Sequence, residues 1–163
     1  MSYGLNKKIT MPELERLMLL SKTDIECTTK HQFSNGVYVR EITMPKDSVI
    51  LGAEHTTTHF NIISKGACIL LDLDTQERTE IVAPCTFESK AGVRKVLYIV
   101  EECVWSTIHV TTETDIEKLE EELTTMSSTY KEIMGTDKFI EGGKSNEYMD
   151  CRNISSDGRV KLS

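Results

Sequence analysis

The regular spacing of short β-type segments between residues 27 and 110 constrains the fold most strongly. Segments rich in Val, Ile, Thr and Tyr recur there, and turn residues separate them roughly every eight to twelve positions. No helical pattern interrupts them, so the sequence predicts a mainly-β, closed or double-sheet antiparallel barrel. The expected strands are 27–33, 36–43, 48–52, 55–64, 67–73, 77–83, 86–88, 94–101 and 103–110.

Two helical patterns flank this region. Thr10–Glu13 reads as a capping box that opens a short amphipathic helix, which we expect to pack on the outside of the barrel. Thr114–Glu117 is a second capping box, and Gly135 is a stop signal. The predicted organisation is therefore one domain: a helical segment over 1–26, a barrel over 27–112, a longer helix over 113–135, and an extended or partly disordered tail over 136–163 that wraps a neighbouring subunit.

The predicted C-terminal helix has an acidic face. Carboxylates near a helix N-terminus favour the helix dipole, and clustered charges are usually solvated, so we interpret this face as exposed to water. Its members are Glu113, Glu117, Glu120, Glu121 and Glu122.

Charge and composition narrow the class of protein. The net charge of −7 argues against a nucleic-acid duplex as the main partner, because phosphate binding requires a positive face. No apolar run is long enough to span a membrane, and the N-terminus lacks a signal-peptide core, so we expect a cytoplasmic protein. The chain has five cysteines but no Cys-x-x-Cys pair, which favours reduced, mostly buried thiols.

The stretch from Gly52 to Gly66 holds the candidate site. His55 and His59 lie four residues apart among β-branched neighbours that favour a strand. Alternate side chains of a strand share a face, so a polar row that ends in apolar residues predicts the lining of a cavity. That row is His55, Thr57, His59, Asn61 and Ile63. The alternative is a pair of exposed histidines on an edge strand.

The last expected strand supplies a second row. Trp105, Thr107 and His109 share one face by alternation. If this face points inward, Trp105 offers a stacking surface and His109 joins the other polar groups. If it points outward, Trp105 is a packing residue. Lys95 is a further candidate ligand-binding residue.

Three other residues carry weaker signals. We interpret His31 as a surface imidazole, with a place near the mouth of the barrel as the alternative. Arg40 and Arg94 have the opposite strand parity to the neighbouring candidates, and we interpret them as surface or subunit-contact residues.

The β region resembles the cupin superfamily, whose RmlC-like fold is a double-stranded β-helix (jelly roll). Its first motif is Gly-x5-His-x-His-x3–4-Glu-x6-Gly, and its second is Gly-x5-Pro-x-Gly-x2-His-x3-Asn. Anchoring on Gly66 places His55 at the second histidine of the first motif and His59 at the glutamate. The remaining positions depart from the pattern: Ala53 and Asp47 in the first motif, and Lys90, Lys95 and Ile99 in the second, where only Gly92 matches.

The resemblance implies a metal site but an incomplete one. Metal cupins use three histidines and one glutamate, whereas only His55 and His59 fall on ligand positions here. Sites with open positions usually have three protein ligands, so Asn61 or His109 would have to complete a site for a divalent ion such as Zn, Fe, Mn or Ni. An inward Lys95 would repel that ion.

A wider set of segments resembles uncharacterised cupin-like proteins of bacteriophages and prophages. These segments are 36–45, the His-x3-His-x-Asn run, 81–84, 104–109 and 112–115. The resemblance implies a viral setting in the host cytoplasm and, because cupins are often dimers, a homodimer.

Three functions remain open at this point. The first is a barrel that binds a small anionic or aromatic molecule without turnover, such as a host metabolite or nucleotide signal, through the candidate residues His55, Thr57, His59, Asn61, Lys95, Trp105 and His109. The second is a cupin enzyme that uses a metal or metal-free acid–base chemistry. The third is a structural protein without a ligand.

Overall fold

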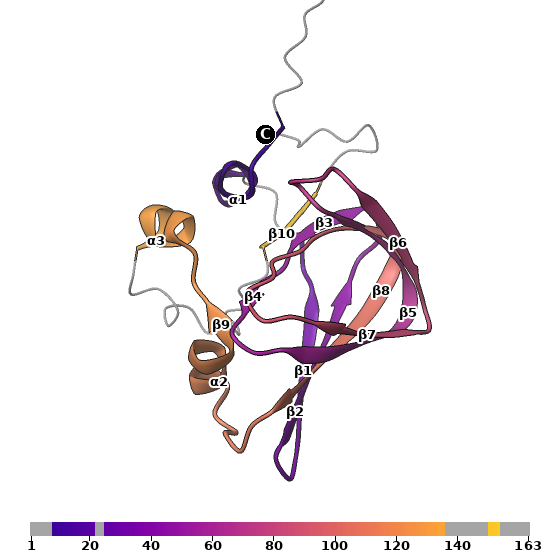
Figure 1. The fold of residues 1–163 in the computed structure, drawn as a ribbon, viewed down its shortest axis with the longest axis vertical. Helices are drawn as coiled ribbons and strands as arrows, with labels where there is room; N and C mark the ends of the chain where they lie inside the picture. Colours follow the sequence, from indigo (N-terminus) through magenta and orange to yellow (C-terminus); the bar gives the residue numbers. More distant parts are fainter. Residues whose placement is uncertain (1–7, 22–24, 136–149, 154–163) are drawn as a thin grey trace, which may run out of the picture.

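The computed structural model describes residues 8–21, 25–135 and 150–153. The chain is mainly β, and its strands curl into a barrel (Figure 1). The strands are β1 (Thr28–Ser34), β2 (Val37–Met44), β3 (Ser48–Leu51), β4 (Glu54–His55), β5 (His59–Leu71), β6 (Arg78–Val82), β7 (Cys85–Ser89), β8 (Val96–Val110), β9 (Thr124–Thr125) and β10 (Asp150–Asn153). The helices are α1 (Met11–Leu20), α2 (Ile116–Leu123) and α3 (Ser128–Met134).

Two long strands, β5 and β8, organise the barrel. They pair antiparallel along most of their length. Beside the second half of β8 lie β2 and β1, and beside the first half of β5 lies β7. Beside the first half of β8 lies β3, which in turn pairs with β10. Beside the second half of β5 lies β6. All pairings are antiparallel, as in a jelly roll, so the predicted fold class is confirmed.

The long strands replace shorter strands that the sequence predicted. Residues 59–71 and 96–110 were each expected to form two strands, with breaks at Lys65–Gly66 and near Glu102. The structure instead shows register shifts in continuous strands between Ile63 and Cys68. Gly66 has φ +85, and a Cβ there would lie 2.1 Å from the Glu102 carbonyl oxygen. A turn-like residue therefore marks a bulge here, where two backbones approach closely.

Strand alternation fills the interior. In the second half of β8 the buried residues are Cys103, Trp105, Thr107 and His109, which confirms the predicted shared face and shows that it points inward. The apolar core also takes Ile42, Met44, Ile50, Ile63, Cys68, Leu97 and Ile99. The four cysteines whose side chains the structure describes are free, as predicted for that part of the chain.

The predicted helix over 113–135 is interrupted. α2 ends at Leu123, and the β-branched residues Thr124 and Thr125 pair with β4 before Ser127 caps α3. Pairing with an exposed strand edge thus replaces about one helical turn in the middle of the predicted helix.

Helix α1 packs on the outside of the barrel, as predicted. Leu14 and Met18 are buried against Val49, Leu51 and Val96. The capping box at Thr10 and Glu13 is present.

A buried ion pair fastens α1 to the barrel and to α3. Arg94 donates to Glu15 at 2.9 Å, and their side chains are 10% and 2% exposed. Arg94 also donates to the Gly52 carbonyl oxygen, and Ser127 donates to Glu15. The interpretation of Arg94 as a surface or subunit-contact residue was therefore wrong, because its charge is paired inside the molecule.

No helix within the described residues is long and apolar enough to cross a membrane. Of the predicted tail, residues 150–153 form β10 against β3, and the remainder lies outside the described residues. The homodimer stays a prediction.

Candidate metal centre

Three histidines meet inside the barrel where β8 ends and β5 begins. His55 lies on β4, His59 on β5 and His109 on β8, and they are 8%, 5% and 2% exposed. The ring centroids are 4.4 Å apart for His55 and His59, 5.0 Å for His55 and His109, and 4.7 Å for His59 and His109. One nitrogen of each ring lies within 4.8 Å of the others. His109 therefore completes the three-histidine set that the sequence left open.

These imidazoles are held neutral. Burial, followed by the charges of His59, His109, Arg40 and Lys95, lowers the pKa of His55 to about 2. Burial, followed by the charges of His59 and Arg40, lowers the pKa of His109 to about 4. Burial also lowers the pKa of His59. Three buried imidazolium cations would lose their hydration and repel one another, so the neutral form of each ring is favoured. A neutral imidazole keeps a lone pair on one nitrogen. Neutral imidazole is the form that binds metal ions.

The hydrogen bonds of the rings suit metal ligands. His59 donates from Nδ1 to the Thr57 carbonyl oxygen at 2.9 Å, which assigns the lone pair to Nε2. A backbone carbonyl in this position is the usual outer partner of a metal-bound histidine. The Nδ1 atoms of His55 and His109 are buried and have no hydrogen-bond partner in the structure. Buried polar atoms rarely lack a partner, so these two nitrogens remain available to a ligand.

Asn61 is not a ligand in this arrangement, because its amide is already bonded. Its nitrogen donates to Ser89 Oγ at 2.7 Å, and its oxygen accepts from Trp105 Nε1 at 2.9 Å. Trp105 is 4% exposed and packs edge-on against Phe87. The indole therefore belongs to the core, and its predicted use in stacking on a ligand remains untested.

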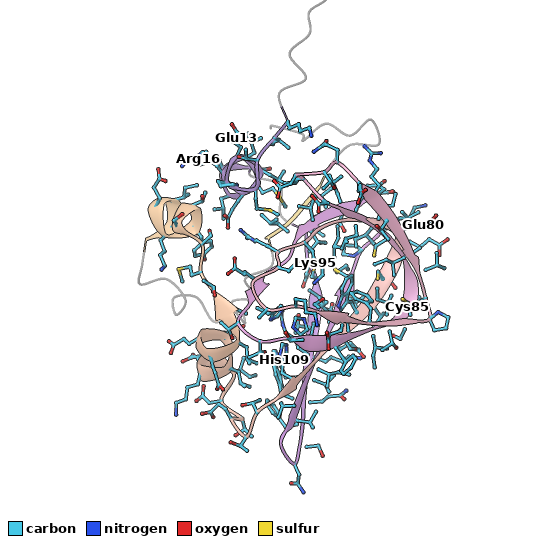
Figure 2. All side chains as sticks on the ribbon, in the orientation of Figure 1. Glu13, Arg16, Glu80, Cys85, Lys95 and His109 are labelled. Atoms are coloured by element: carbon cyan, nitrogen blue, oxygen red, sulfur yellow. The ribbon has the colours of Figure 1, made fainter. Side chains whose placement is uncertain are left out.

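Lys95 also lies near the histidine cluster. Its Nζ donates to Ser89 Oγ at 2.5 Å. Burial lowers its pKa, and its charge lowers the pKa of His55 and His59. Figure 2 shows Lys95 and His109 within the ring of strands, with Cys85 at its far side. Lys95 thus lies close enough to act on the site by charge.

Thr57 departs from the predicted row. The row was expected to run along one strand from His55, but a bend at 56–57 separates β4 from β5 and leaves Thr57 exposed. Its side chain does not share the face of the histidines, whereas Asn61 and Ile63 on β5 do. Thr57 contributes its backbone carbonyl to His59 instead.

A cavity of about 20 Å³ lies beside two of the histidines. From the barrel it is lined by Tyr38, Arg40, Ala53, His55 and His109. From the segment that follows β8 it is lined by Leu119, Glu120, Leu123 and Thr124. This volume holds about one water molecule or a single ion.

Sequence reasoning missed Arg40, Tyr38 and Glu120 as site residues. Arg40 shares the inward face of β2 with Tyr38 and Ile42, so its assignment to the surface was wrong. The alternation Tyr38–Arg40–Ile42 was the available signal. Glu120 was grouped with the solvated acidic face, and only the docking of α2 brings it to the cavity. His31 bonds to the Tyr38 hydroxyl at 2.8 Å and is half-buried, which supports the place near the mouth.

Comparison with known proteins gives similarity of fold only. No protein-family model matches the sequence, and no curated protein matches it. A cupin superfamily protein from Desulfitobacterium hafniense has 10% identity and a TM-score of 0.44 over 58% of this chain and 86% of its own. An RmlC-like cupin with a double-stranded β-helix from Methanocaldococcus jannaschii has 12% identity and a TM-score of 0.42 over 56% and 86%. The comparisons do not support the resemblance to phage proteins, which stays a prediction.

Proposed function

We propose that the barrel binds one divalent transition-metal ion through His55, His59 and His109 and presents it to a small anionic ligand. The observation that carries this proposal is the convergence of three buried imidazole nitrogens within 4.8 Å of one another. Three protein ligands with a position left over are typical of catalytic rather than structural metal sites.

The donor set suits several ions. Imidazole is a good ligand for Zn, Fe and Ni, and Mn is the remaining candidate. An ion in this site would act as a Lewis acid and lower the pKa of a bound water molecule. The residues of the chain supply the rest: the Thr57 carbonyl orients His59, and the burial of the three histidines limits the access of water to the site.

Charge favours an anion as the ligand. Arg40 and Lys95 both lower the pKa of His55, so both act on the centre as positive charges. With a divalent ion present, the positive charge around the cavity would exceed the single carboxylate of Glu120 among the described residues that line it. A negatively charged ligand offsets this excess. The small cavity favours a ligand of few atoms over an aromatic one.

Binding without a metal is the second candidate. The same two cations, Arg40 and Lys95, disfavour a bare metal ion and would serve a metal-free binder of small anions. In that case the histidines line the site as neutral polar groups. The protein would then sense or sequester its ligand without turnover.

Native mass spectrometry with elemental analysis of untagged protein, purified without chelator, tests the proposal. We expect one divalent ion per chain in the wild type and in His31→Ala, which removes the one histidine outside the cluster. His109→Ala should weaken metal binding by more than about 100-fold, since loss of an outer partner alone costs 10–100-fold. A retained organic anion without metal would support the second candidate. Equal metal content in both variants would refute the three-histidine site.

A further inference from the structure

Helix α2 forms one wall of the cavity. Leu119 and Leu123 are 1% and 3% exposed and pack on Tyr38 in a small cluster separate from the main core. The other wall consists of Tyr38 and Arg40 on β2, His55 on β4, His109 on β8, and Ala53, which lies between β3 and β4. In Figure 1 α2 and β9 lie beside β4, outside the ring of strands.

The cavity has little room, so a ligand larger than a water molecule would displace part of its lining. About 20 Å³ holds one water molecule, and formate or azide has three heavy atoms. The strands that carry His59, His109 and Arg40 are held by extended ladders with their neighbours. The α2 wall rests on two buried leucines and on hydrogen bonds at its C-terminal end, which is less than the strand ladders provide, so it is the wall that yields most easily.

The C-terminal end of α2 remains attached to the site. Thr56 donates from its backbone nitrogen to the Leu123 carbonyl at 2.9 Å and from its hydroxyl to the Glu122 carbonyl at 2.7 Å. His55 itself pairs with Thr124. A displaced α2 would therefore stay close to the strand that carries one of the three histidines.

Glu120 and Arg40 line the same cavity with opposite charges. Among the described lining residues, Glu120 supplies the one carboxylate and Arg40 the one guanidinium. The Glu120 carboxylate and the carboxylate of a ligand would both be attracted to Arg40. Within one small cavity these two negative charges would also repel each other.

We infer that α2 is a displaceable cover and that Glu120 is a specificity-determining residue, which competes with the entering anion for the positive charge of Arg40. This inference rests on the proposed function in taking a small anion, a monocarboxylate or an inorganic anion of similar size, as the ligand. Anions that bind weakly to Arg40 fail to displace Glu120. The cover therefore admits only anions whose attraction to Arg40 exceeds that of Glu120.

The first experiment tests the cover without any metal. Diethyl pyrocarbonate modifies accessible imidazoles, and peptide mass spectrometry resolves the modified sites. In the metal-free protein we expect Leu123→Ala to raise the modification rates of His55 and His109 by about tenfold while that of His31 stays within about twofold. Phe60→Ala, at an exposed position, is the control. Unchanged rates at His55 and His109, or a parallel rise at His31, would overturn the cover.

The second experiment tests Glu120. Calorimetry measures formate binding to the Co²⁺-loaded protein, or to the metal-free protein if Co²⁺ does not bind, because Arg40 is present in both. Glu120→Gln should tighten formate binding by about tenfold. Glu121→Gln removes the same charge from an exposed position on the same helix and should change it by less than about twofold.

The outcomes separate the two ideas. Equal or weaker formate binding by Glu120→Gln would overturn the role of Glu120. Absence of Co²⁺ binding in the wild type would instead contradict the proposed metal site, and the formate comparison would still decide the role of Glu120.

Discussion

His59 donates its Nδ1 proton to the carbonyl oxygen of Thr57, two residues earlier in the chain, at 2.9 Å. This bond fixes the tautomer of the ring before any ligand arrives. The bend at 56–57, which interrupts the predicted strand 55–64 near its start, is therefore the feature that prepares His59 to bind through Nε2.

Metal binding should stabilise the fold. With free Zn²⁺ or Co²⁺ at 100 times its dissociation constant, we expect about 2.7 kcal/mol of added stability, because the unfolded chain lacks the assembled site. Thermal unfolding with and without the ion, and after addition of a chelator, measures this. With binding weakened by more than about 100-fold, His109→Ala should gain at most about 0.4 kcal/mol, and an equal shift in that variant would place the ion elsewhere.

Acid should destabilise the metal-free protein. The pKa values of His55 and His109 are about 2 and about 4 in the folded state, against about 6.5 when unfolded. The unfolded chain therefore binds more protons below pH 6.5, and stability falls from there to about pH 4 for His109 and further for His55. Each pH unit within this window costs about 1.4 kcal/mol per histidine.

Urea unfolding at a series of pH values tests this dependence. His109→Gln should reduce the slope of stability against pH between about 6 and 4. A slope unchanged from that of the wild type would contradict the low pKa of His109.

Gly66→Ala should prevent stable folding. The added Cβ would lie 2.1 Å from the Glu102 carbonyl oxygen, and φ +85 is strained for any residue with a side chain. We expect a loss of more than about 3 kcal/mol, measured as soluble yield and unfolding midpoint. Gly36→Ala has a similar φ but nothing within 4 Å, so it should cost only about 1 kcal/mol.

Removing one partner of the buried pair should cost far more than removing an exposed one. Glu15→Met leaves the Arg94 charge buried without its carboxylate, and we expect a loss of about 3–5 kcal/mol. Arg16→Met breaks the pair with Glu132, whose side chains are 46% and 63% exposed, and should cost at most about 1 kcal/mol. The double variant Glu15→Met/Arg94→Met should recover most of the loss. Urea unfolding measures all three, and equal losses in the two single variants would refute the distinction.

The sequence by itself determined the class of fold and most of the site. Alternation in β8 placed Trp105, Thr107 and His109 on one face, and the same rule placed His59 with Asn61. Turn residues located most strand ends. These features are local, since a strand alternates whatever lies beside it. The same rule applied to β2 would have turned Arg40 inward.

Only the tertiary structure decided which residues meet. His109 joins His55 and His59 because β8 ends beside the start of β5, a register that depends on the bulges around Gly66. Glu120 reaches the cavity because Thr124 and Thr125 pair with β4 and fold α2 against Tyr38. Such contacts join segments far apart in the chain, and their pairing is set by the packing of the whole barrel rather than by any local pattern.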